Sequence, residues 1–383
     1  MLRANGLALL ALGFLAGVGS AGCGSDENSG GPGPSMTPDA GVNPFQPMNL
    51  EAASAALSAL LATSATATTD PAKTPIGMVT NSSSPVWNAF QIGVGRAGSK
   101  IGCPTSVGLL TATTDKATAQ AAMIQQLIDQ KYPGISTSPS TANADDEARF
   151  AALVTAQKAH GQMVLFDSDL PQSGRALYIG ADNYKAGLAH GREVVRVLAG
   201  KGGKVFPMSS VNSDAVRERL RGLQEAIAGT PNILLQPLQT GADAASVQML
   251  ATKTMDENPD MVMFAGLSNG GTVGPANAVA TSKKGGQILI VGYDATAQNQ
   301  QHLKNGVISA LVGQRFYWEG FLVTQALYAM AQPNIGVAKV FETLKPWLSG
   351  TNGDMIDLGI DILTPENLTP YLSYLESIGI LSQ

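Results

Sequence analysis

Residues 163–183 read MVLFDSDLPQSGRALYIGADN, and this stretch decides the fold that we expect for the chain. Two short apolar runs, 163–166 and 176–180, have the pattern of buried strands. An acidic turn with proline and glycine joins them, and Asp182 and Asn183 then begin a helical pattern. Because open α/β sheets bind ligands outside the carboxyl ends of their strands, we interpret the turn as half of a binding cleft. The second run then leads the chain to another domain.

Strand and helix patterns alternate from Pro75 onward, which is typical of parallel βαβ units. The expected strands are 76–80, 107–112, 134–139, 163–166, 176–180, 204–208, 233–238, 261–265, 288–292, 308–312 and 355–363. The expected helices are 88–101, 115–130, 144–159, 184–198, 213–228, 244–257, 272–281, 316–330 and 365–378. This order predicts an α/β fold with two doubly wound, parallel-sheet lobes joined by several crossings. The amino-terminal lobe would comprise 75–181 plus 315–357, and the carboxyl-terminal lobe 182–314 plus 358–383.

The composition excludes several classes of function. Of 383 residues, 24 are basic and 29 acidic, so nucleic acid is not expected as a partner. The two cysteines and three histidines lie too far apart in sequence to predict a metal site, and no motif calls for a cofactor.

Residues 1–22 have the pattern of a signal peptide. Arg3 precedes an apolar run, 7–18, that is too short to span a bilayer comfortably. Small residues then lead to Cys23, which resembles a bacterial lipoprotein signal whose cysteine becomes the acylated first residue. Ser20 stands where a leucine is normally expected, so an ordinary signal peptide cleaved nearby is the alternative. Either reading exports the protein.

Residues 23–74 are expected to form a lipidated tether with one short helix. The segment 24–47 is rich in Gly, Pro, Ser, Asp and Asn, whereas 50–62 has apolar residues at helical spacing. That helix either packs on the body of the protein or belongs to the stalk. With Cys23 lipidated, Cys103 is expected to be an unpaired, buried thiol.

Four short motifs follow one another along the body of the chain: SPVW at 84–87; FDSD at 166–169 with IGADN at 179–183; VRER at 216–219 with Gly222; and VGYD at 291–294 with Gly313 and Gln314. In order and spacing they resemble the periplasmic sugar-binding proteins of the ribose-binding type. The sensor domains of the lactose-repressor family share that fold. The resemblance covers most of 75–363 and implies a type I periplasmic binding protein-like fold, with a hinge of three crossings and a ligand between the lobes.

A sugar offers hydroxyls at its edge and weakly polar C–H faces, so its site needs carboxylates, amides, guanidinium and an aromatic plane. The resemblance implies Trp87 as the stacking aromatic, Asp167 and Asp294 as acceptors, and Arg219 as a forked donor. Trp87 packed under a loop is the alternative. The rest of the implied site is Ser84, Ser168, Asp169, Ser268, Asn269 and Gln314. Which of Arg217, Arg219 and Arg221 faces the cleft stays open.

The hinge is expected at Asp182, Asn183, Gln314 and Asp357, with Asp182 and Asn183 also capping a helix.

Two departures from the ribose binders make ribose itself an unsafe prediction. The loop 266–271 reads GLSNGG where the family has an asparagine or a tryptophan-rich loop. Ser84 and Val86 replace an asparagine and an aromatic residue.

A serine hydrolase is the enzyme alternative, because 266–270 matches G-x-S-x-G between a strand and a helix. Asp294 and His302 follow Ser268 in hydrolase order. They lie too close together in sequence, however, and no oxyanion segment of the HGGG type is present. We therefore expect no enzyme.

The function expected is a monomeric, lipid-anchored periplasmic receptor that closes around a sugar or sugar-like ligand and presents it to a membrane ABC permease. A ligand-sensing partner of a chemoreceptor or sensor kinase is the alternative. An interaction lipoprotein without a ligand is a third.

Overall fold

The computed structural model describes residues 45–63, 69–230 and 232–380. These residues lie in the compact unit formed by 43–383. The expected signal peptide and Cys23 fall outside the described residues. Within them, the longest apolar helices are too short or too polar to cross a membrane. Cys103 is buried and forms no disulfide, and burial raises the pKa of its thiol to about 11.

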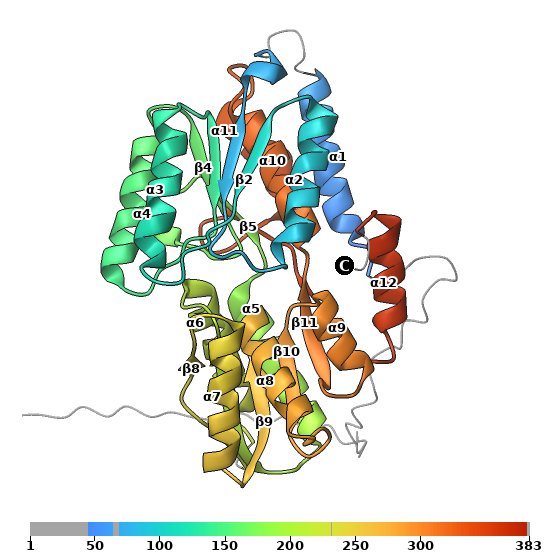
Figure 1. Cartoon of the computed structure of the whole chain (residues 1–383). Helices are drawn as coiled ribbons and strands as arrows, with labels where there is room; N and C mark the ends of the chain where they lie inside the picture. The colour runs from blue at the N-terminus through green and yellow to red at the C-terminus, as the bar shows by residue number, and fades with distance from the viewer. Residues whose placement is uncertain (1–44, 64–68, 231, 381–383) are drawn as a thin grey trace, which may run out of the picture. The chain divides into compact units, whose positions relative to one another are not determined.

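Two largely parallel sheets form the frame of the two lobes (Figure 1). The order of strands in the first is β12 (Leu348–Ser349), β13 (Met355–Asp357), β5 (Leu177–Gly180), β4 (Gln162–Phe166), β3 (Gly134–Thr137), β1 (Ile76–Val79) and β2 (Thr105–Gly108). In the second it is β14 (Ile360–Leu363), β11 (Ala310–Gln314), β10 (Leu289–Tyr293), β9 (Met261–Gly266), β6 (Gly203–Ser209) and β7 (Ile233–Leu235), with β8 (Gln239–Thr240) also paired to β6. Only the β12–β13 and β11–β14 pairs are antiparallel among these strands.

Helices cover both faces of the first sheet. One face carries α2 (Trp87–Ile101) and α10 (Phe316–Met330), and the other carries α3 (Lys116–Asp129) and α4 (Ala144–Gln157). The apolar face predicted for α2 is the one it buries, through Phe90, Val94 and Ala97. Its Gly93 lets α10 approach closely, since a Cβ there would lie 2.1 Å from the carbonyl oxygen of Tyr317.

The second sheet is covered in the same way. On one face lie α5 (Asn183–Leu198) and α6 (Asp214–Ile227), whose Val216, Leu223 and Ile227 are buried as their spacing predicts. On the other lie α7 (Ala244–Glu257), α8 (Asn269–Thr281), α9 (Ala297–Lys304) and α12 (Leu368–Ser377). The prediction of two doubly wound lobes is therefore confirmed.

The helix expected in the tether belongs to the body of the first lobe. As α1 (Met48–Thr63) it packs against α10 and α11 (Gly336–Leu344) and buries Leu50, Ala53 and Leu57. Just before it, the Phe45 ring meets the edge of Tyr371 in α12, with the ring centroids 5.4 Å apart. The segment 48–63 is thus not a free stalk.

The chain crosses between the lobes three times: from β5 to α5, from β11 to α10, and from β13 to β14. The last crossing corrects one expected element. We predicted one strand over 355–363, but its two halves belong to different sheets, because Leu358 and Gly359 make the crossing and Gly359 turns the backbone at φ 69°.

Two other strand predictions are wrong in part. The strand expected at 107–112 ends at Gly108 in the structure, and residues 110–113 form a loop that reaches the site described below. The strand expected at 233–238 ends at Leu235 as β7, and the separate short strand β8 follows it at 239–240. The helix α11 and the strand β12 were not predicted.

Candidate functional site

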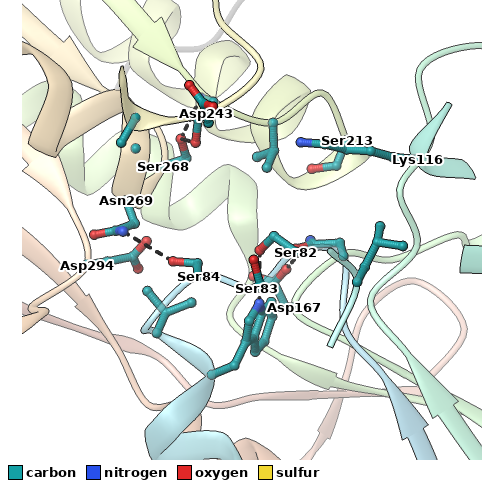
Figure 2. Close-up of a pocket in the computed structure, with 18 of the residues that line it drawn as sticks. Ser82, Ser83, Ser84, Lys116, Asp167, Ser213, Asp243, Ser268, Asn269 and Asp294 are labelled. Atoms are coloured by element: carbon teal, nitrogen blue, oxygen red, sulfur yellow. Dashed lines mark hydrogen bonds between the residues drawn. The ribbon is translucent and has the colours of Figure 1, made fainter. Parts of the chain in front are cut away.

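A pocket of about 220 Å³ lies between the two lobes, at the carboxyl ends of their strands (Figure 2). The first lobe lines it with Asn81, the loop 82–87, the loop 110–113, Lys116 and Asp167. The second lobe contributes Ser210, Ser213, Arg219, Asp243, Ser268, Asn269, Asp294 and Gln314, among others. Ligand pockets usually measure about 300–1,000 Å³, so this one suits a compact, polar molecule.

Asp167 occupies the floor of the pocket, directly after β4. One carboxylate oxygen accepts hydrogen bonds from the Ser138 hydroxyl (2.7 Å) and the Asn81 amide (3.2 Å). The other lies 3.4 Å from Nη2 of Arg219. The backbone at Asp167 has φ 55°, and its N–H donates to Oε1 of Glu319 at 2.9 Å. This fixed backbone aims the carboxylate into the pocket.

Arg219 enters the pocket from the first half of α6, and only 3% of it is exposed. Its guanidinium donates to Oδ1 of Asn183 (2.7 Å), to Oε1 of Gln314 (2.8 Å) and to the carbonyl of Leu267 (3.1 Å). Beneath it lies the ring of Tyr293, whose centroid is 4.5 Å from Cζ. The position of the fork is therefore set from several sides before any ligand binds.

The neighbouring arginines point elsewhere. Arg217 pairs with Glu147 of the other lobe at 2.9 Å, and Arg221 pairs with Glu218 on the exposed face of the helix. Of the three arginines in this helix, Arg219 is the one that lines the pocket.

Asp294 follows β10 and adopts a left-handed backbone conformation, with φ 72°. Its Oδ1 accepts a hydrogen bond of 2.8 Å from the Gln314 amide. Burial raises the pKa of Asp294 to about 6, although the charge of Arg219 and the bond from Gln314 act in the opposite direction. Gln314 therefore links the guanidinium of Arg219 to this second carboxylate.

Ser84 and Asn269 meet across the pocket. The Asn269 amide donates to the Ser84 hydroxyl at 3.2 Å, as the dashed line in Figure 2 marks. The amide oxygen of Asn269 accepts from Thr296 and Asn299, both at 3.1 Å. These two predicted site residues thus form a direct contact between the lobes.

Ser268 is a helix cap. Its hydroxyl oxygen accepts hydrogen bonds from the backbone N–H of Gly271 (3.2 Å) at the start of α8 and from that of Ser210 (3.0 Å). His302 instead lies 2.9 Å from the Asn277 amide oxygen, and Asp294 is engaged by Gln314. The three residues of the hydrolase alternative therefore do not form a triad.

Trp87 lines the pocket and also belongs to the apolar core. It is 2% exposed and meets the rings of Phe90, Phe166 and Phe316 edge to face. Its indole N–H donates to the Ser82 hydroxyl at 3.0 Å. Most of the Trp87 side chain is thus packed in the core, as the alternative to a stacking role predicted. Its contact with a ligand stays a prediction.

Ser168 and Asp169 do not line the pocket, unlike the neighbouring Asp167. Asp169 forms an ion pair with Arg175, whose guanidinium is buried and also reaches Asp354 at 3.1 Å. A buried guanidinium needs such counter-charges, which explains why Asp169 turns away. The Ser168 hydroxyl accepts a 3.3 Å hydrogen bond from the backbone N–H of Ala215 in the other lobe.

The predicted hinge residues join the crossings to the site. Asp182 is the N-cap of α5, as expected, and its backbone N–H donates to Asp357 at 3.0 Å. The Asn183 amide donates to the carbonyl of Asp167 at 2.7 Å. Gln314 ends β11, where the chain leaves the second lobe. Whether the chain bends at these residues stays a prediction.

Sequence reasoning missed four residues of the site. Asn81 and Ser138 lie just beyond β1 and β3, where the rule for open sheets places ligand-facing side chains. Lys116 reaches across the pocket edge to the carbonyl of Ala242 at 3.2 Å, and burial lowers its pKa. Glu319 was detectable as the single acid in the apolar helix α10; burial raises its pKa well above the ordinary value.

Among the described residues, no three His, Cys, Asp or Glu side chains come together in a way that would hold a metal ion.

The sequence matches the family model of a periplasmic binding protein domain over residues 76–334. It is 23% identical over 270 residues to the xylose/arabinose-binding protein XylF of Sulfolobus acidocaldarius, covering 68% of this chain and 63% of that protein. It is 23% identical over 171 residues to the ribose import binding protein RbsB of Salmonella typhimurium, covering 44% and 57%. The chain thus spans less than two thirds of the length of either relative.

Solved structures with the same fold include two arabinose complexes. One is an ABC transporter solute-binding protein from Burkholderia graminis, with 22% identity, a TM-score of 0.67, and 79% of this chain and 98% of that chain covered. The other is a carbohydrate transporter solute-binding protein from Agrobacterium radiobacter, with 18% identity, a TM-score of 0.69, and 80% and 99% covered. The likeness shows a shared fold.

Proposed function

Because the chain belongs to the family of periplasmic binding protein domains, we propose that it is a receptor whose lobes close around a sugar or sugar-like ligand. It is a binding protein and not an enzyme. One observation carries the proposal: Asp167 from the first lobe meets Arg219, Asp294 and Gln314 from the second in one pocket. These groups are the acceptors and donors that a ring of hydroxyls requires.

The chemistry of the pocket favours a neutral polyol over a charged ligand. Its carboxylates and guanidinium neutralise one another, so no single sign of charge prevails. The contact from Arg219 to Asp167 is long, at 3.4 Å, and a ligand hydroxyl can replace it with two shorter bonds, one to each group. Trp87 supplies an apolar surface to the same pocket. The names of the relatives, which bind xylose, arabinose or ribose, point to the same class.

Ligand-driven closure follows from the contacts between the lobes. They include Ser84 with Asn269, Ser168 with Ala215, and Arg217 with Glu147. Such polar contacts are individually weak in water, so a ligand that bridges the lobes shifts the equilibrium toward the closed state. Three crossings of the described chain join the two sheets, and they suit a hinge motion.

A thermal-shift screen over pentoses, hexoses and polyols tests the proposal. We expect one sugar to raise the melting temperature of the protein, and Asp167→Ala and Arg219→Ala to remove that shift. Arg221→Ala, in the same helix but on its exposed face, is the matched control and should keep it. Absence of a shift with every compound would refute the sugar ligand. A shift that survives in both site variants would refute the site.

The proposal extends to the membrane. Residues 1–22 support export, and Cys23 is proposed as the lipid attachment point of a periplasmic lipoprotein that serves an ABC permease. Labelling of the full chain with an alkyne fatty acid in a bacterial host should depend on Cys23. Label that persists in Cys23→Ala would contradict the anchor. A sensor kinase or chemoreceptor remains the alternative partner, and co-purification with permease subunits would decide against it.

A further inference from the structure

A second cavity of about 470 Å³ lies beside the first and is not used by the proposed sugar site. The two cavities share part of their walls, including Pro85, Asn269, Asp294 and Gln314. A molecule held by Asp294 in the first cavity therefore lies next to the second. We call this second cavity the side chamber.

The side chamber has a more apolar wall than the first cavity. Its walls include Val86, Ala89, Ile92, Phe316, Leu375 and Ile378. Besides Asp294, its charged residues are Arg315 and Asp361, which form an ion pair at 2.8 Å. The indole N–H of Trp318 donates to the Tyr374 hydroxyl at 2.6 Å. These polar groups already have partners, so the chamber offers little to another sugar and much to an apolar group.

The outer wall of the side chamber is the carboxyl-terminal helix α12, which is attached to both lobes. Its Leu368 and Tyr371 belong to the core of the second lobe. At its other end, the guanidinium of Arg96 in α2 donates to the carbonyls of Ile378 and Gly379. Figure 1 shows α12 beside α9, on the side of the lobes that carries α1 and α2. The family match ends at residue 334, so this wall lies outside it.

We infer that the ligand is a glycoside with an apolar substituent: the sugar occupies the polar pocket and an alkyl or aryl group occupies the side chamber. The inference rests on the proposed function, because it takes the sugar position from it. Protein interiors leave few voids larger than water, and ligand sites typically measure about 300–1,000 Å³ with mostly apolar walls. The side chamber fits that description, and the wall residues that it shares with the polar pocket favour an amphiphilic ligand that reaches both.

Calorimetric titration of the full chain with free sugars and matched glycosides tests the inference. The probes are xylose, arabinose, ribose, glucose and galactose, each also as its methyl and hexyl glycoside. We expect the hexyl glycoside of one sugar to bind at least about tenfold more tightly than its methyl glycoside, since burial of apolar surface favours binding.

Two variants test whether the side chamber causes the tighter binding of the hexyl glycoside. Ala89→Trp fills the side chamber without touching the polar pocket, and it should bring the hexyl affinity down to the methyl affinity while leaving the latter unchanged. Ala148→Trp, on the exposed face of α4, is the matched control and should keep the tenfold gain. A gain that persists in Ala89→Trp would overturn the assignment of the chamber.

The outcomes separate this inference from the proposed function. If a free sugar or methyl glycoside binds and no hexyl glycoside binds more tightly, the inference fails and the sugar receptor stands. If only a hexyl glycoside binds, both are supported. If no probe binds, both the proposed function and this inference fail.

Discussion

Replacing Asp294 with asparagine should change how the stability of the protein depends on pH. Asp294 is buried, and its pKa is raised from an ordinary value of 3.8 to about 6. The folded protein therefore holds this proton more tightly than the unfolded chain does. The contribution of the protonated Asp294 carboxyl to the free energy of unfolding is present at pH 4 and is lost as the pH rises through about 6.

The magnitude follows from the shift. About two pKa units, at about 1.4 kcal/mol each, amount to roughly 3 kcal/mol between pH 4 and pH 7. The amide of Asp294→Asn cannot ionise and keeps the shape of the protonated acid. The variant should therefore be close to the parent protein in stability at pH 4. At pH 7 its free energy of unfolding should have gained roughly 3 kcal/mol relative to the parent.

Urea unfolding of both proteins at pH 4, 5, 6 and 7 measures this difference. Glu319 is also buried with a raised pKa, and it contributes with the same sign in both proteins, so the comparison largely cancels it. Identical pH profiles for the parent and Asp294→Asn would refute the reasoning about the buried carboxylate.

Three further predictions concern the lobes and their contacts. Arg219→Ala should lower the free energy of unfolding by about 3 kcal/mol, because it leaves Asp167 without its counter-charge. Arg221→Ala should change the same quantity by less than about 0.5 kcal/mol. Chemical denaturation of the two variants measures both changes. Leu57→Ala should lower the free energy of unfolding by about 3 kcal/mol in the same assay, since α1 belongs to the core of the first lobe. A change near zero would mean that α1 does not pack on the core. Ser84→Ala should weaken sugar binding about fivefold, because the closed state loses one hydrogen bond of about 1 kcal/mol; unchanged affinity by calorimetry would mean that the contact with Asn269 does not support closure.

Much of the fold was predictable because strand and helix periods alternate clearly. The helices 244–257 and 316–330 were predicted to the residue. The single strand expected at 355–363 was wrong because both of its halves are apolar and extended. Only Gly359 marks the break, and one glycine does not reveal that the chain changes sheets there.

The direction of a site residue was easier to predict on a helix than in a loop, because helix geometry fixes which residues share a face. Arg219 lies three residues after Val216 and four before Leu223, so it shares their face, whereas Arg217 and Arg221 share another. The sequence left the choice among the three arginines open, and the structure places Arg219 at the pocket, as this spacing favours. Asp167 and Asp169 could not be separated in this way. Their directions depend on the backbone at Asp167 and on Arg175, which the turn brings back to Asp169.

The central claim is that a sugar-like ligand is bound between the lobes by groups from both. A crystal structure of the protein with the strongest compound from the thermal-shift screen tests it most directly. We predict electron density for the ligand within hydrogen-bonding distance of Asp167 on one lobe and of Arg219 and Asp294 on the other. Density for the ligand on one lobe alone, or away from these three side chains, would contradict the account.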